Sequence, residues 1–190
     1  MSFVQRLNVL TIAFFVVMLA VGCHPRMMPT SGSEGEYNAS SNTTAYEVRP
    51  YGKVTMPGKW VTGKYNKATG KQFFYRDDTT TLSVVIAPCA NMPYGKKGLE
   101  GYEFVQKYYE IESRFQTELQ EQTPKLLVED KDNRYMLWMV HSDGIDQYFL
   151  CGVKDCSCNE CTYRSFNLKN RRLSEAASKR LLQDMFLGEK

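Results

Sequence analysis

Residues 102–120 read YEFVQKYYEIESRFQTELQ and carry a helical pattern around which the rest of the chain is organised. Apolar side chains recur there every three or four residues, which is the spacing of the buried stripe of an amphipathic helix. The stripe consists of Phe104, Tyr108, Ile111, Phe115 and Leu119, with Val105 on its flank. Pro124 follows and cannot continue a helix. A helix over 102–120 therefore divides the chain into an earlier and a later part.

Short β-rich runs precede this helix. Residues 54–61 include the sequence MPGKW at 56–60, a turn that leads into a strand with Trp60 as a large aromatic anchor. Residues 71–76 and 81–87 are also rich in β-branched and aromatic residues, and turn-forming residues separate them. The part before the helix is therefore predicted to be three strands in meander order.

Four more strand candidates follow the helix, at 125–129, 135–141, 147–153 and 162–168. Each is rich in β-branched, aromatic or other apolar residues. Turn-forming residues at 130–133 and 142–144 separate the first three. The later part of the chain is therefore expected to add four strands.

A second amphipathic helix is expected at the end of the chain. Ser174 is suited to its N-cap, and Gly188 stands past its end. Its buried stripe would consist of Ala177, Leu181, Met185 and Phe186. The order becomes βββ-α-ββββ-α. It predicts an α+β fold, an antiparallel sheet of about six to seven strands with two helices packed on one side.

Two short motifs in this order resemble those of the PsbP-like fold. The strand entry MPGKW at 56–60 resembles its Pro-x-x-Trp-type opening, and Met185-Phe186 resembles the bulky apolar residues near the end of its last helix. The resemblance covers residues 53–187 and implies an assembly or accessory role rather than catalysis. It implies no functional residue. Other α+β folds, such as the cystatin-like fold, can carry motifs of this kind.

Composition and charge narrow the functional classes. The chain has 190 residues, of which 43% are hydrophobic and 24% are charged, so it has room for one domain with an ordinary core. Its formal charge is +3, and Arg6 is the only charged side chain among residues 1–22. Removal of those residues leaves a charge of +2, which is too small to indicate binding to nucleic acid.

Residues 1–22 have the order of an export signal. A single positive charge at Arg6 is followed by a mostly apolar run over 7–21, and the small residue Gly22 precedes Cys23. The apolar run is shorter than the roughly 20 residues that cross a hydrocarbon core. A permanent transmembrane anchor is therefore the weaker interpretation.

Residues 19–23, Leu-Ala-Val-Gly-Cys, resemble the lipobox of bacterial lipoproteins, with Ala20 where that motif prefers leucine. The resemblance implies a signal peptide over 1–22, transfer of a diacylglycerol to the Cys23 thiol, and cleavage that makes Cys23 the first residue. The alternative is an ordinary secretory signal in which Cys23 is merely near the cut. Either interpretation exports the domain.

Residues 23–47 are predicted to be a flexible tether. Ser, Gly, Thr, Asn and Glu dominate most of this segment. It has too few apolar side chains for their burial to offset the conformational entropy lost on ordering. A single α+β domain is then expected over 48–190. Acyl chains on Cys23, at about 0.8 kcal/mol per buried CH₂, would hold it on a lipid bilayer. The expected location is the bacterial cell envelope, facing the periplasm or the exterior.

Five further cysteines lie in the expected domain: Cys89, Cys151, Cys156, Cys158 and Cys161. They are disulfide candidates, because an exported protein meets an oxidising compartment. Cys151 is predicted to face Cys161 across a hairpin, where opposite Cα atoms reach the roughly 4.4–6.8 Å that a disulfide needs. Free thiols are one alternative. The other is a metal site formed by Cys151, Cys156, Cys158 and Cys161.

The remaining candidate sites are weaker than the cysteine cluster. An anion site at a helix N-terminus could be formed by four loop residues, Gly95, Lys96, Lys97 and Gly98, although turns explain these glycines equally well. His24 and His141 are the only histidines, so no multi-histidine metal centre can form. No combination of nucleophile and base indicates a catalytic residue. Nothing in the sequence calls for a cofactor.

These features predict an exported, membrane-tethered lipoprotein whose non-catalytic head binds a protein or another envelope component. Such a head is expected to expose a contiguous apolar or aromatic patch. One alternative is a small-ligand binder or enzyme that uses a cavity between sheet and helix, which a closed polar pocket containing His141 and a carboxylate would favour. The other is a protein that binds metal through its cysteine cluster.

Overall fold

The computed structural model describes residues 34–157 and 160–188, with side chains described except at 155–160. The elements before the long helix are β1 (Glu36–Asn38), β2 (Thr43–Val48), β3 (Gly52–Pro57), β4 (Val61–Asn66), β5 (Lys71–Tyr75), β6 (Thr81–Pro88) and two short 3-10 helices, η1 (Cys89–Asn91) and η2 (Gly95–Lys97). The remaining elements are α2 (Gly101–Gln120), β7 (Lys125–Asp130), β8 (Tyr135–Ser142), β9 (Ile145–Ser157), β10 (Glu160–Asn170) and α3 (Glu175–Leu187).

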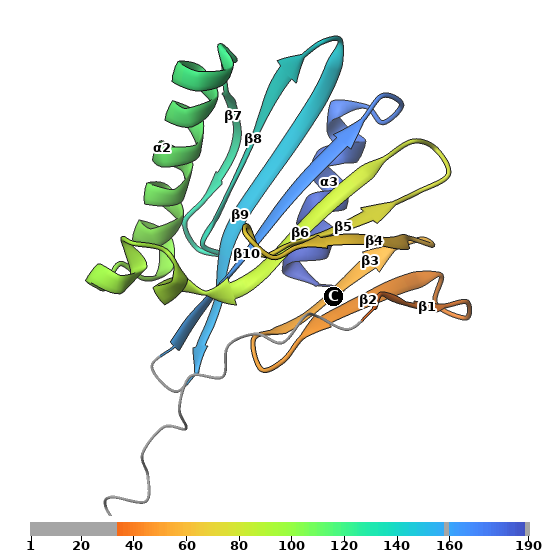
Figure 1. Ribbon diagram of the computed structural model, residues 1–190, viewed down its shortest axis with the longest axis horizontal. Coiled ribbons are helices and arrows are strands. Elements are labelled where there is room, and N and C mark those ends of the chain that lie inside the picture. The colour runs from red at the N-terminus through yellow and green to blue at the C-terminus, as the bar shows by residue number, and fades with distance from the viewer. Residues whose placement is uncertain (1–33, 158–159, 189–190) are drawn as a thin grey trace, which may run out of the picture.

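Seven of the strands form one antiparallel sheet in the order β4-β5-β6-β10-β9-β8-β7 (Figure 1). The first three strands form a separate antiparallel sheet in the order β1-β2-β3. At the centre of the large sheet β6 pairs with β10, so the parts of the chain before and after α2 share one sheet. The predicted α+β class, with strands on both sides of α2 and a helix at the end, is confirmed. In the described part of the chain, six strands rather than three precede α2, because the predicted strand over 54–61 spans the end of β3 and the start of β4, which lie in different sheets.

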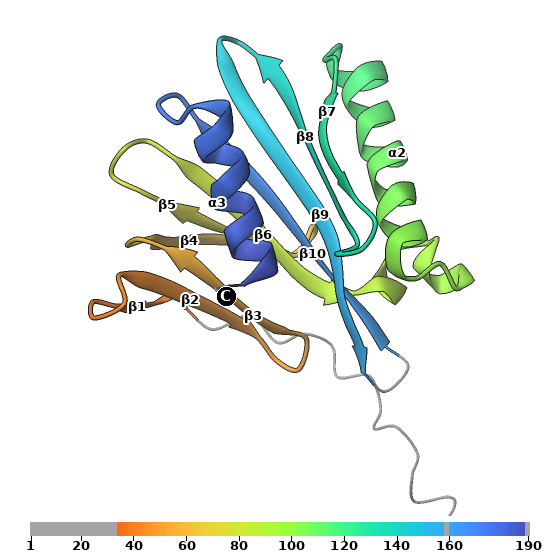
Figure 2. The ribbon, with the colours of Figure 1, turned by 180° about the vertical axis from the view of Figure 1, so that it is seen from behind.

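The two helices cover opposite faces of the large sheet, so the prediction that both pack on one side is wrong. Successive residues of a strand point to opposite faces. On β8, Leu137 packs in the core that contains Leu182 of α3, whereas its neighbour Trp138 packs in the core that contains Phe104 of α2. Figure 2 shows α3 in front of the sheet, and Figure 1 shows it behind.

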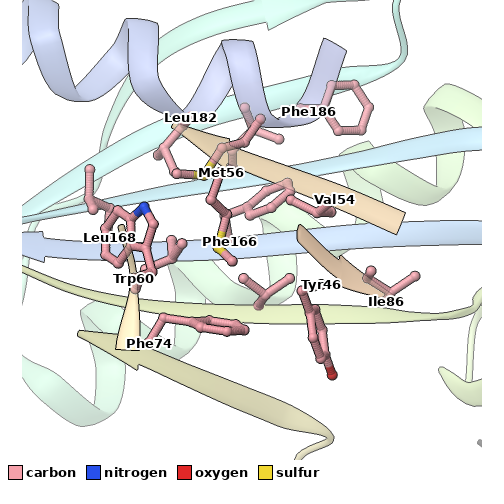
Figure 3. Packing of buried hydrophobic residues seen from close by; sticks show 14 of the residues in the cluster. Tyr46, Val54, Met56, Trp60, Phe74, Ile86, Phe166, Leu168, Leu182 and Phe186 are labelled. Atoms are coloured by element: carbon pink, nitrogen blue, oxygen red, sulfur yellow. The ribbon is translucent and has the colours of Figure 1, made fainter. Parts of the chain in front are cut away.

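The core on the α3 side joins the two sheets, as Figure 3 shows. Its large side chains come from both sheets and from α3, and include Tyr46, Val54, Met56, Trp60, Phe74, Ile86, Phe166, Leu168, Leu182 and Phe186. Trp60 is buried and donates its indole N–H to the carbonyl oxygen of Pro57 at 2.9 Å. The predicted aromatic anchor is therefore confirmed, because the MPGKW turn folds back onto its own indole.

The predicted tether over 23–47 is wrong for its last part, because β1 and most of β2 lie in it. Thr44, Tyr46 and Val48 occupy alternate positions of β2 and are all buried. Such alternation is the signal of a half-buried strand, but it is short and lies among polar residues. Residues 1–33, which contain the predicted signal peptide and Cys23, lie outside the described residues.

The ends of α3 agree with the prediction. Ser174 caps the helix, its hydroxyl accepting from the amide of Ala177 at 3.2 Å, and Gly188 follows with a φ of 85°. The buried stripe is shifted by one residue in its first turn, since Ala177 is exposed and Ser178 is buried. Ser178 accepts a hydrogen bond from the side chain of Asn170 at 3.1 Å. That bond explains how a polar residue occupies the stripe.

Candidate functional site

The register of β9 and β10 separates Cys151 from Cys161. Cys151 lies opposite Ser165, and Lys154 lies opposite Thr162. Cys161 is thus four residues along β10 from the partner of Cys151, a distance of about 13 Å at the rise of a strand. A disulfide needs Cα atoms about 4.4–6.8 Å apart. The predicted bridge between Cys151 and Cys161 is therefore wrong.

Cys89, Cys151 and Cys161 are buried in the core on the α2 side of the sheet. Cys158 and the side chain of Cys156 lie outside the described residues, so the four-cysteine metal site falls partly there. Within the described part of the chain, no three His, Cys, Asp or Glu side chains are grouped to hold a metal ion. Burial raises the pKa of the Cys151 thiol well above its ordinary value, which makes it a poor nucleophile at neutral pH.

The loop predicted to bind an anion is closed by its own hydrogen bonds. The amides of Lys96, Lys97 and Gly98 donate to carbonyl oxygens of residues 92–95 at 3.0–3.1 Å, so they are not directed at a ligand. Gly95 is needed for close packing, since an added Cβ would lie 1.9 Å from the carbonyl oxygen of Cys89. These glycines and lysines are explained as a tight turn.

A small pocket lies away from both helices. Its volume is about 290 Å³. It lies between β2, the turn after β4, the end of β6 and the loop around η1, and its lining includes Tyr46, Tyr65, Lys67, Asn91 and Tyr163. No histidine, aspartate or glutamate lines it. His141 is exposed at the end of β8, with its Nδ1 2.7 Å from Oδ1 of Asp146. Among the described lining residues, the ionisable groups are one lysine and three tyrosines, and the pocket does not contain His141.

The apolar stripe of α2 is buried only in its first half. Tyr108 is buried, whereas Phe115 and Leu119 are 46% and 72% exposed, so the prediction that they join the core is wrong. Gln116 is buried instead and accepts a hydrogen bond from the indole N–H of Trp138 at 3.2 Å. The second half of α2 is thus held to β8 by a polar contact while it presents apolar side chains to solvent.

Phe115 lies on the side of α2 that is turned toward the centre of the sheet. Phe104, three turns earlier on the same side, packs against Tyr163 of β10 with ring centroids 5.3 Å apart. On the other side of the helix Tyr109 packs against Trp138 of β8, also at 5.3 Å. Beyond β10 on this face lie β6, β5 and β4, over which Figure 1 shows no helix.

A row of side chains crosses the large sheet on the α2 side. Register pairs connect, from β7 to β5, Leu126, Trp138, Phe149, Asn167, Ser83 and Phe73. The rings of Trp138 and Phe149 stack, with centroids 5.4 Å apart and planes 10° apart. Next to Phe73, Tyr75 pairs with Val61 at the edge of the sheet. Val61, Phe73, Tyr75, Phe115, Leu119 and Phe149 lie on this side of the sheet or on the helix that covers it, and we call this set of side chains the open face.

Exposed apolar side chains are concentrated on the α2 side. Among the described residues, seven large apolar side chains are exposed, and five belong to this side: Val61, Tyr75, Phe115, Leu119 and Leu126. The other two are Tyr37 and Leu187. Sequence reasoning missed this face because it assigned a helical stripe to the core. The available signal was β5, where aromatic residues at 73, 74 and 75 place rings on both faces.

A half-buried carboxylate, Glu112, lies one turn after Tyr108 on α2. Burial raises the pKa of Glu112, and the Lys71 ammonium acts against this shift. The Tyr108 hydroxyl lies 3.0 Å from Oγ of Ser165, and burial raises the pKa of Tyr108 as well. No second acid or histidine contributes to the shift of Glu112.

Within the described residues no helix combines the length and the apolar character needed to cross a bilayer. The resemblances to the lipobox and to the PsbP-like fold remain predictions. No family model matches this chain, and no curated protein matches it.

Proposed function

We propose that the chain is an exported lipoprotein, anchored through acylated Cys23, whose head binds a protein partner on the open face and catalyses no reaction. The order of positive charge, apolar run and Gly22-Cys23 supports export and anchorage. The observation that carries the role of the head is the concentration of exposed apolar side chains on the α2 side of the sheet. Apolar side chains that form a contiguous patch on a surface mark sites of protein–protein interaction.

The exposed side chains favour a protein over a polysaccharide. Leu119 and Val61 are more than half exposed and offer only aliphatic groups, which sugar hydroxyls do not complement. A protein partner can bury such side chains, at about 1.5–3 kcal/mol for each that is fully covered. Aromatic rings of the kind that Tyr75 and Phe149 supply are enriched among residues that dominate binding energy.

The two alternatives have less support. The pocket beside η1 is at the lower limit of about 300–1,000 Å³ for small-molecule sites, and it lacks the histidine and carboxylate that an enzyme of this kind would need. Binding of a small ligand there stays open as the second function. A metal-binding role would require Cys156 and Cys158, whose side chains lie outside the described residues.

Site-specific photocrosslinking in living cells tests the proposal. A photoreactive phenylalanine analogue is placed at position 119 on α2 and, in a second variant, at position 75 on β5, in the full chain. Both positions should crosslink to one and the same protein, because they lie on one face. Leu119→Asp should then weaken the crosslink formed from position 75 at least several-fold.

Position 187 is the matched control, because Leu187 is as exposed as Leu126 but belongs to α3, on the opposite face. It should not capture that partner. Equal capture from position 187, capture of different proteins from positions 75 and 119, or no protein at either position would reject the open face as the binding site. The anchor is tested separately at Cys23, so the two halves of the proposal can fail independently.

A further inference from the structure

Cys89 and Cys161 occupy the two places that follow the last paired residues of β6 and β10. The ladder between these antiparallel strands ends with Pro88 opposite Thr162. Cys89 follows Pro88 in the chain, and Cys161 precedes Thr162. Both cysteines therefore lie just beyond the same end of the ladder. η1, which Cys89 begins, contacts β10. The pair beside them, Pro88 and Thr162, has the Cα separation of an antiparallel ladder, about 4.5–5.5 Å, and a disulfide spans about 4.4–6.8 Å.

Both side chains lie on the same face of the sheet. Cys89 is 3% exposed and Cys161 is 4% exposed, and both belong to the core on the α2 side. Tyr163, two residues after Cys161, belongs to that core, and so does Ala87, two residues before Cys89. The two thiols therefore lie on one side of the sheet.

Cys151 is not an equivalent partner for either of them. It lies opposite Ser165, and Ser165 lies opposite Val85. Cys151 is thus four residues along the ladder from the position of Cys161 and Cys89, or about 13 Å. Of the three cysteines whose side chains are described, only Cys89 and Cys161 lie at the same end of the ladder between β6 and β10, and the structure describes all three as thiols.

We infer that Cys89 and Cys161 form a disulfide that joins the end of β6 to β10. The two thiols lose two protons and two electrons, and a sulfur–sulfur bond forms. The electrons reduce the disulfide of an oxidant, either an oxidised thiol–disulfide oxidoreductase of the exporting compartment or oxidised glutathione, which leaves as two thiols. Because both cysteines are buried, the bond forms during folding, before the core closes.

The bridge acts on the loop between β6 and α2. Asn91 and Met92 of this loop line the small pocket, and Gly95 packs against the carbonyl oxygen of Cys89. A bond from Cys89 to β10 therefore fixes one wall of the pocket as well as the chain that leads into α2. Neither role depends on what the open face binds.

Peptide mapping of the full chain, isolated from cells with detergent and alkylated without reduction, tests the inference. Cleavage after Lys154, Glu160 and Arg164 isolates Cys161 from Cys156 and Cys158, and cleavage after Arg76 and Lys96 isolates Cys89. Mass spectrometry should find the Cys89 peptide joined to the Cys161 peptide in most molecules. Reduction should release both peptides. Chain that is unfolded, reduced and refolded in a glutathione redox buffer should form the same link.

Cys151→Ser is the matched control, because it removes a buried thiol of the same core and should leave the link intact. Cys89→Ser should abolish the link and leave Cys161 alkylated or joined elsewhere. The inference is rejected if Cys161 of the unsubstituted chain is joined to Cys156 or Cys158, or if both Cys89 and Cys161 are alkylated even after refolding in the glutathione buffer. The refolding arm is independent of cellular location, so a failure of export and a failure of the bridge are distinguishable.

Discussion

The hydroxyl groups of Tyr108 on α2 and Ser165 on β10 lie 3.0 Å apart and link the helix to the centre of the large sheet. Ser165 is also the residue opposite Cys151, so this contact lies directly beside the buried thiol. On the β8 side, Trp138 and Gln116 form a second polar link between helix and sheet. Phe115 of the open face is the neighbour of Gln116 on α2. The position of α2 therefore rests on a few polar contacts as well as on apolar packing.

Tyr108→Phe should lower the free energy of unfolding by about 1 kcal/mol, because it removes one hydrogen bond and leaves a partner hydroxyl in the interface. Equilibrium unfolding in urea, followed by circular dichroism, measures the change. Tyr109→Phe removes a hydroxyl from a half-buried residue of the same helix and should change stability by less than about 0.5 kcal/mol. Equal losses in the two variants would contradict the assigned role of Tyr108.

Leu119→Ser should change the free energy of unfolding by less than about 0.5 kcal/mol, because an exposed side chain contributes little to the core. Leu182→Ala on α3 removes a fully buried side chain and should cost about 2–5 kcal/mol. The comparison separates Leu119, which the sequence predicts to be buried and the structure exposes, from a side chain of α3 that the structure buries. A loss of more than about 2 kcal/mol for Leu119→Ser would place Leu119 in the core after all.

Glu112→Gln should stabilise the protein at neutral pH. Burial raises the pKa of Glu112 in the folded state, so its ionised form disfavours folding relative to an exposed carboxylate. The advantage of the glutamine should shrink as the pH falls through the raised pKa toward the ordinary value of 4.5, because the carboxyl of the unsubstituted protein then becomes neutral as well. Urea unfolding of both proteins across this range measures it. A gain for Glu112→Gln that is the same at every pH in this range would show no linkage between this carboxyl and folding, and would contradict the raised pKa.

Cys23→Ser should abolish labelling by a fatty-acid analogue and leave the precursor uncleaved by the lipoprotein-specific peptidase. Only a thiol at this position can accept the diacylglycerol that cleavage requires. Labelled lipid and electrophoretic mobility are read in the same cells. Cys89→Ser, a substitution within the folded domain, should leave both unchanged. Labelling that persists in Cys23→Ser would show that another residue is acylated.

Local patterns determined most elements of the fold before any contact was known. The helical spacing over 102–120, the N-cap at Ser174 and the turn-bounded strands all act through neighbouring residues, so they can be read from a short window. β2 was readable too, from the alternation of Thr44, Tyr46 and Val48. Tyr135–Val140 is apolar throughout, which is the pattern of a strand buried on both faces. That pattern already favours one helix on each side of the sheet.

The registers and the open face depend on contacts between distant segments, and no local pattern specifies them. Thr162, next to Cys161, pairs with Pro88 at the end of β6 because β6 and β10 are neighbours in the sheet. Sequence spacing within 151–161 carries no information about that pairing. Phe115 and Leu119 have the spacing of a buried stripe, yet both side chains are exposed, because the sheet does not cover them. Periodicity fixes which side chains share a face of a helix, and only the arrangement of the sheet decides whether anything packs against that face.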